Sequence, residues 1–79
     1  MPRTTPLAVV RRRRLLSQRQ LAEAAGLSHT VIVDIETGKS RPRGATMRKI
    51  ADALDVSVDQ IAEFKRAIEA GPRQLELAA

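Results

Sequence analysis

The sequence predicts a compact all-α domain of five helices. Apolar residues recur at helical spacing, residues of the helix-capping type precede several of these stretches, and glycine or proline separates one from the next. The chain has 79 residues and no cysteine, so packing rather than disulfide bonds must hold a single domain together. One histidine, His29, is too few for a metal cluster, and we expect neither a metal nor a cofactor.

The first predicted helix covers residues 6–14 and follows an N-terminal arm of residues 1–5. Thr5 is a favourable capping residue. Proline is tolerated at the first helical position because its missing N–H would have no partner there. We therefore expect Thr5 to cap a helix that begins at Pro6.

The second predicted helix covers residues 18–25 and opens with a capping box. In this motif the side chains of Ser17 and Gln20 satisfy each other's backbone N–H groups. Gly26 follows, and glycine adopts the positive φ of a tight turn at low steric cost. An apolar stripe along this helix indicates the side that packs inward. It consists of Leu21, Ala22 and Ala25.

The third predicted helix covers residues 29–37. Ser28 is placed to cap its start, and Gly38 is placed to end it. On a helical wheel Ile32 and Ile35 share one side, so we expect these two side chains to anchor the helix while its opposite face looks outward.

The fourth predicted helix follows an extended loop of residues 39–44. Its apolar positions repeat at helical spacing, at Met47, Ile50, Ala51 and Leu54. Arg43 occupies the position where a capping serine or threonine is favoured. We therefore expect this helix to begin late, near Ala45 or Thr46.

The fifth predicted helix covers residues 58–69. A second capping box, Ser57 with Gln60, precedes it, and a Gly-Pro pair at residues 71–72 ends it. The predicted domain thus covers residues 6–70. Residues 71–79 show neither a period nor a cap, so we expect a flexible tail.

Charge and composition point to duplex DNA as the partner. Residues 1–49 carry 11 basic and three acidic side chains, whereas residues 50–79 carry three basic and six acidic ones. A polyanion should therefore meet the N-terminal two-thirds of the chain. Only one aromatic residue, Phe64, is present, which argues against the base stacking that single-strand binders use. No stretch is long and apolar enough to span a membrane, and we expect a cytoplasmic protein.

The two short helices and the glycine turn between them resemble the helix-turn-helix of the Cro and phage-repressor family, the xenobiotic-response-element type. Ala22 is small where the helices must approach, and Gly26 occupies the turn. The resemblance covers about residues 7–64 without a gap. It implies a lambda-repressor-like fold and a repressor that binds operator DNA as a dimer. Further matching stretches are residues 16–18, 35–39 and 49–57.

The outward face of the third predicted helix would then meet the base edges of the major groove. Histidine can donate to guanine, threonine can serve several bases, and valine can touch a thymine methyl group. A carboxylate accepts from cytosine N4 but is repelled by phosphates. Asp34 therefore either reads a cytosine or limits the affinity. The predicted base-reading residues are His29, Thr30, Val33 and Asp34.

A rim of polar and basic residues is expected to hold the sugar-phosphate backbone. The start of the second helix corresponds to a phosphate clamp in the resembled family, and a helix N-terminus favours an anion. Any one polar or basic residue of such a rim, taken alone, is more often an ordinary solvated side chain. The predicted rim consists of Gln18, Arg19, Ser28, Thr37, Lys39, Arg41 and Arg43. Arg11 and Glu36 correspond to an ion pair of the phage repressors, and we assign them a structural role.

We therefore expect a transcriptional regulator, most simply a repressor, that binds a pseudo-palindromic site as a homodimer. The C-terminal helix, with Phe64 and Ile68, is the expected dimer or partner surface. One alternative is a DNA-binding antitoxin whose tail, with Leu75 and Leu77, covers a toxin. Another is an adaptor that keeps the fold without reading DNA. The sequence contains neither a nucleophile paired with a base nor a phosphate-binding loop, so we do not expect an enzyme.

Overall fold

The computed structural model describes residues 4–70, and within them every regular element is helical, as the sequence predicts. The tail, residues 71–79, and the first three residues of the predicted arm lie outside the described residues. None of the helices among residues 4–70 is long and apolar enough to cross a bilayer. The elements are α1 (Leu7–Arg13), α2 (Gln18–Ala25), α3 (His29–Thr37), α4 (Gly44–Leu54), the 3₁₀ turn η1 (Val58–Gln60) and α5 (Ala62–Ala70).

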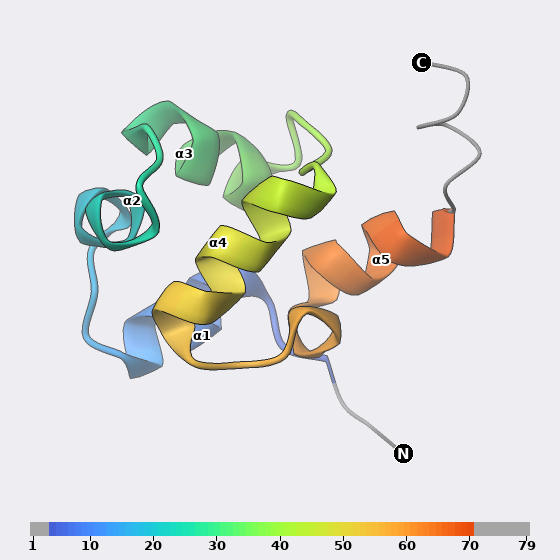
Figure 1. The fold of residues 1–79 in the computed structure, drawn as a ribbon, viewed down its shortest axis with the longest axis horizontal. Helices are drawn as coiled ribbons and strands as arrows, with labels where there is room; N and C mark the ends of the chain where they lie inside the picture. The colour runs from blue at the N-terminus through green and yellow to red at the C-terminus, as the bar shows by residue number, and fades with distance from the viewer. Residues whose placement is uncertain (1–3, 71–79) are drawn as a thin grey trace.

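Helix α4 runs through the middle of the molecule, with α2 and α3 on one side, α5 on the other and α1 behind it (Figure 1). Helix α2 packs against both α3 and α4. Apolar side chains from all five helices meet in one core. The largest fully buried side chains are Phe64, Leu7, Leu21, Ile32, Ile35, Ile50, Leu54 and Ile61.

The α2–turn–α3 unit forms as its capping signals predict. Ser17 Oγ accepts from the backbone N–H of Gln20 at 3.0 Å, and Gln20 Oε1 accepts from the Ser17 N–H at 2.8 Å. Gly26 follows α2 with a φ of 71°, and Ser28 caps α3 by accepting from the Val31 N–H at 3.4 Å. Each of these bonds lies within three residues in sequence, so the unit depends on local contacts.

The cap of α1 differs from the prediction. Pro6, not Thr5, is the N-cap residue, and no side chain of this segment caps the helix. The backbone N–H of Leu7 instead donates to Oε1 of Glu63 on α5, at 2.8 Å. A carboxylate is a favourable partner for a helix N-terminus because it accepts from free N–H groups and opposes the helix dipole. The predicted hydroxyl cap at Thr5 is therefore wrong, and a distant residue takes its place.

The fifth predicted helix, residues 58–69, is broken into η1 and α5. Ile61 lies between them in an extended conformation, with φ −93° and ψ 123°. The backbone of Thr5 pairs beside it: its N–H donates to the Gln60 carbonyl and its carbonyl accepts from the Ala62 N–H, both at 2.9 Å. This pairing needs extended backbone at Ile61, which a continuous helix would not supply. The helix therefore restarts at Ala62.

Helix α4 also departs from its expected start. Arg43 provides no side-chain cap, as predicted, yet the helix begins at Gly44 rather than near Ala45 or Thr46. Arg43 has extended backbone, and its carbonyl accepts from the Met47 N–H at 2.9 Å. The first helical hydrogen bond thus forms without a capping side chain, and the helix does not start late.

Leu15, in the α1–α2 turn, has a φ of 59° and is 89% exposed. A residue with a Cβ is strained in this left-handed region by about 1–2 kcal/mol. Glycine relieves this strain, but it loses more conformational entropy on folding, which costs about 0.5–1 kcal/mol of stability. Leu15→Gly is therefore expected to raise the free energy of unfolding by about 0.5–1 kcal/mol in urea titrations. Arg14→Gly is the control, because Arg14 has a φ of −91°. It should lower the stability, and a gain in both variants would contradict the assignment of strain to Leu15.

Candidate nucleic-acid interface

Helix α3 is anchored along one side only. Ile32 is fully buried and Ile35 is 2% exposed, and both belong to the core that α2 and α4 share. The turn that precedes α3 and the left-handed Gly38 that ends it keep the helix short. An anchored helix with a free opposite face can enter a groove of DNA without unfolding any part of the core.

The four predicted base-reading residues all lie on accessible surface of α3. Thr30 is exposed, and His29, Val33 and Asp34 are partly exposed. The carboxylate of Asp34 accepts no hydrogen bond among residues 4–70. It is therefore available to a donor from outside the chain. The structure leaves this face open to solvent, and base contact by these residues stays a prediction.

The C-terminal end of α3 is tied to the loop that follows. The carbonyl of Asp34 accepts from the backbone N–H of Lys39 at 2.8 Å and from that of Ser40 at 3.4 Å. The Thr37 hydroxyl donates to the Val33 carbonyl at 2.8 Å. The hydroxyl hydrogen of Thr37 is therefore engaged within the helix, and the hydroxyl oxygen can still accept a hydrogen bond. Contact of Thr37 with the sugar-phosphate backbone stays a prediction.

The ion pair expected between Arg11 and Glu36 is present and nearly enclosed. Arg11 Nε donates to Glu36 Oε2 at 2.7 Å and Nη2 to Oε1 at 3.1 Å, while Nη1 donates to the Leu16 carbonyl at 2.9 Å. The side chains of Arg11 and Glu36 are only 10% and 7% exposed. Two parallel bonds in such a dry place fix geometry as well as charge. The pair ties α1 to α3.

Gln18, predicted as a phosphate clamp, joins the same network. Its Nε2 donates to Glu36 Oε1 at 3.0 Å, so one carboxylate collects three hydrogen bonds from α1 and α2. No local pattern in the sequence indicates this contact, because 18 residues separate the partners. The amide oxygen of Gln18 accepts no hydrogen bond among residues 4–70. The amide is therefore held by Glu36, while the start of α2 stays accessible. Phosphate binding there stays a prediction.

The remaining rim residues come from three places in the chain. They are all exposed, and the Ser28 hydroxyl already accepts from the Val31 N–H in capping α3. The loop after α3 lies against α5, and together they enclose a hollow of about 200 Å³. The rim residues are Arg19 on α2, Ser28 at the start of α3, and Lys39, Arg41 and Arg43 in the loop before α4.

The expected dimer surface on α5 needs one correction. Phe64 is fully buried and belongs to the core, so it is not available to a partner. Ile68, one turn further on, is 47% exposed. Helical periodicity places both residues on similar sides of a helix but does not say which of them the core covers. Of the two residues, only Ile68 can contribute to a surface for a second molecule.

Comparison with known proteins agrees with this arrangement. A family model described as helix-turn-helix matches residues 7–61, from the first residue of α1 to the residue before α5. The chain is 38% identical over 55 residues to the immunity repressor protein of Bacillus phage phi105, which covers 70% of this chain and 38% of that protein. It is 35% identical over 74 residues to the uncharacterized HTH-type transcriptional regulator RghRB of Bacillus subtilis strain 168, which covers 92% of this chain and 53% of that protein. The matches therefore span about half or less of each relative.

Proposed function

The chain belongs to the helix-turn-helix family, as its resemblance predicted, and on that premise we propose that it binds duplex DNA sequence-specifically and regulates transcription, acting as a repressor. The two relatives named above are called a repressor and a transcriptional regulator. Because the proposed partner is chromosomal or phage DNA, the proposed place of action is the bacterial cytoplasm.

The observation that carries this proposal is the one-sided anchoring of α3. Ile32 and Ile35 hold the helix from beneath, and the enclosed Arg11–Glu36 pair locks α3 to α1. The opposite face presents His29 and its neighbours at a common surface. Basic residues then precede and follow α3 along the chain, where a DNA backbone would flank an inserted helix.

The direct test is selection of bound sites from random duplexes at two salt concentrations. We expect a palindromic consensus, and an affinity that falls linearly with the logarithm of the salt concentration, by about 0.9 log units per log unit of salt for each phosphate contact. Enrichment of no motif would contradict sequence-specific binding. Affinity that does not change with salt would favour the adaptor alternative. The antitoxin alternative depended on residues 75–77, which lie outside the described residues.

Replacing Asp34 with alanine separates two roles of its carboxylate. If the carboxylate accepts from a cytosine, Asp34→Ala should reduce discrimination at one base pair by about 1–3 kcal/mol. We expect this result because no donor within residues 4–70 satisfies the carboxylate. Competition binding against single-base variants of the selected site measures it. The control is Asp59→Ala on η1, which removes one exposed carboxylate elsewhere. A uniform gain of affinity for every site, absent from the control, would show that Asp34 repels DNA instead.

We further propose that two copies associate through α5 and place their α3 helices about one DNA turn, ~34 Å, apart. Ile68 is the large apolar residue that α5 exposes among the described residues. Ile68→Lys should shift the chain toward a monomer in sedimentation equilibrium and weaken binding to a full palindrome more than to a half-site. Leu15→Lys is the matched control, since Leu15 is the other exposed large apolar residue among residues 4–70. Equal effects of both changes would place the interface elsewhere.

A further inference from the structure

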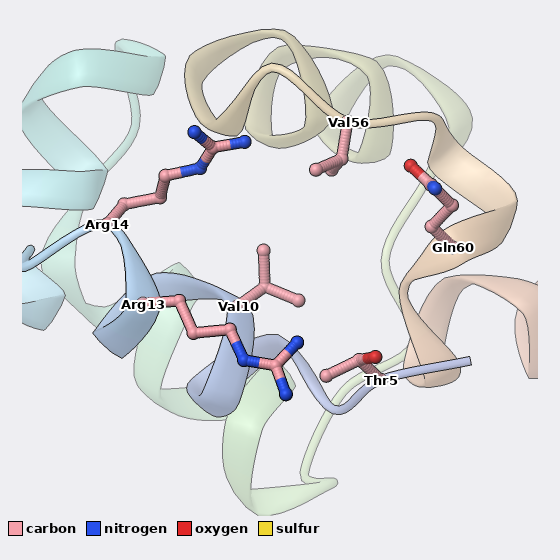
Figure 2. Close-up of a pocket in the computed structure, with 6 residues that line it drawn as sticks. All are labelled: Thr5, Val10, Arg13, Arg14, Val56 and Gln60. Atoms are coloured by element: carbon pink, nitrogen blue, oxygen red, sulfur yellow. The ribbon is translucent and has the colours of Figure 1, made fainter. Parts of the chain in front are cut away.

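A cavity of about 290 Å³ opens between α1, the segment before it and the chain that joins α4 to η1. Figure 2 shows Arg13, at the end of α1, and Arg14, just after it, reaching toward the cavity, with Val56 and Gln60 across from them. No residue of α2 or α3 lines it, so it is separate from the proposed DNA surface. The lining residues are Thr5, Val10, Arg13, Arg14, Val56 and Gln60.

The cations of this cavity have no partner within the described part of the chain. The side chains of Arg13 and Arg14 make no hydrogen bond and no ion pair among residues 4–70, whereas the neighbouring Arg11 side chain is engaged with Glu36 and the Leu16 carbonyl. Both guanidinium groups border the same cavity and carry like charge, so an anion bound in the cavity would lower their mutual repulsion. The two groups can offer several N–H donors to one anion from different directions.

The other polar groups of the lining add donors and no carboxylate. The side-chain oxygen of Gln60 accepts from the Ser57 N–H at 2.8 Å, so the amide NH₂ is the group it has left to offer. Thr5 uses its backbone N–H and carbonyl in the pairing around Ile61, and its hydroxyl has no hydrogen-bond partner among residues 4–70. A cavity lined by donors selects a ligand rich in acceptors.

Positive and negative charges lie on opposite sides of the cavity, and this arrangement determines how a ligand would be oriented. A neighbouring hollow shares Val56 and Gln60 with the cavity and is lined by Asp52 and Asp55. The negative charge therefore borders the α4 side and the positive charge borders the α1 side. An anionic group would lie against the two arginines. An uncharged group would lie over Val56, with Val10 as a second apolar contact.

We propose that this cavity binds a small organic phosphate, a phosphate monoester with a short aliphatic group. Two guanidinium groups, an amide and a hydroxyl suit the three free oxygens of a phosphate monoester better than the two of a carboxylate. The volume of about 290 Å³ lies just below the usual range of small-molecule pockets, about 300–1,000 Å³, which favours a small ligand. The inference does not depend on DNA binding.

The test uses the whole chain and butyl phosphate as the probe, with inorganic phosphate beside it. Titration followed by ¹⁵N NMR should shift the backbone signals of residues 10–14 and 56–61 and leave those of residues 29–37 in place. Butyl phosphate should bind at least about threefold more tightly than inorganic phosphate, because the butyl group removes apolar surface from water. Equal affinities, or shifts confined to the start of α2, would overturn the proposal.

Two double variants with the same loss of charge identify the site. Arg13→Gln with Arg14→Gln should weaken butyl phosphate by about tenfold or more, because charge-assisted hydrogen bonds are lost. Arg12→Gln with Arg48→Gln should change the affinity less than about twofold. Arg12 and Arg48 are exposed and do not line the cavity. All four side chains are exposed, so both variants should fold. Equal losses of butyl phosphate affinity in the two variants would show that only the overall charge matters and would overturn the proposal.

The phosphate groups of the DNA backbone could also bind to these two arginines. Adding duplex DNA distinguishes this possibility from binding of a small organic phosphate. If the arginines serve a small ligand, saturating duplex DNA should leave butyl phosphate bound, and both double variants should weaken DNA to the same extent. Displacement of butyl phosphate by DNA, together with a greater loss of DNA affinity in the Arg13/Arg14 variant, would assign the arginines to the DNA backbone instead.

Discussion

Replacing Glu36 with alanine is expected to lower the free energy of unfolding by about 3–5 kcal/mol, because it leaves the buried guanidinium of Arg11 without its charge partner. The loss is large against the total stability of a small domain, about 5–15 kcal/mol. The Arg11 side chain is 10% exposed, so water cannot easily replace the lost carboxylate. Gln18 loses its acceptor at the same time. Urea titration followed by circular dichroism measures the change.

The control for this prediction is Glu23→Ala on α2. Glu23 is exposed, and its replacement should change the stability by less than about 0.5 kcal/mol. A double replacement, Arg11→Met with Glu36→Met, should recover much of the loss, since apolar residues of similar volume avoid the desolvation of both charges. A small effect of Glu36→Ala, equal to that of Glu23→Ala, would contradict a structural role for the pair.

Replacing Thr30 with glutamate is expected to weaken duplex binding by about a hundredfold or more while the fold stays intact. Thr30 is exposed on the face of α3 opposite the core, so the change removes no packing. A carboxylate placed in the major groove faces phosphates and base acceptors, and juxtaposed like charges cost several kcal/mol. Fluorescence anisotropy on a selected operator, with the unfolding temperature measured in parallel, separates the two effects.

Thr4→Glu makes the same chemical change away from α3. Thr4 is exposed and lines a hollow with residues of α5, including Lys65 and Arg66. We expect less than about a threefold loss of affinity from it, since distant exposed charges are screened. If both glutamates weaken DNA equally, general repulsion explains the loss and α3 is not the reading helix. If neither does, the proposed orientation of the domain on DNA is wrong.

The α2–turn–α3 unit could be predicted because its determinants are local. Ser17 reaches Gln20, Ser28 reaches Val31, and Gly26 takes the left-handed turn, all within a few residues. Such contacts depend on residue type and spacing, which a sequence displays directly. The candidate reading face followed from the same periodicity, because burial of Ile32 leaves the opposite side of a short helix outward.

The ends of the molecule could not be predicted in the same way. The α1 cap comes from Glu63, 56 residues from the Leu7 N–H that it accepts from. The break at Ile61 exists because Thr5 pairs on both sides of it. Neither position carries a local signal, since a glutamate within a helix looks like any solvated charge and the capping box at Ser57 fits a longer helix equally well.

By itself the sequence determined the all-α class, the family, the α2–turn–α3 unit and the Arg11–Glu36 pair that the family resemblance implied. The tertiary structure alone decided that Phe64 is core rather than contact surface and that Gln18 is held by Glu36. It also decided that a cavity is bordered by two arginines whose side chains have no partner among residues 4–70. The division has one physical reason. Hydrogen bonds and helical periods within a few residues are properties of sequence spacing, whereas the side of a helix that becomes buried depends on how distant segments pack against it.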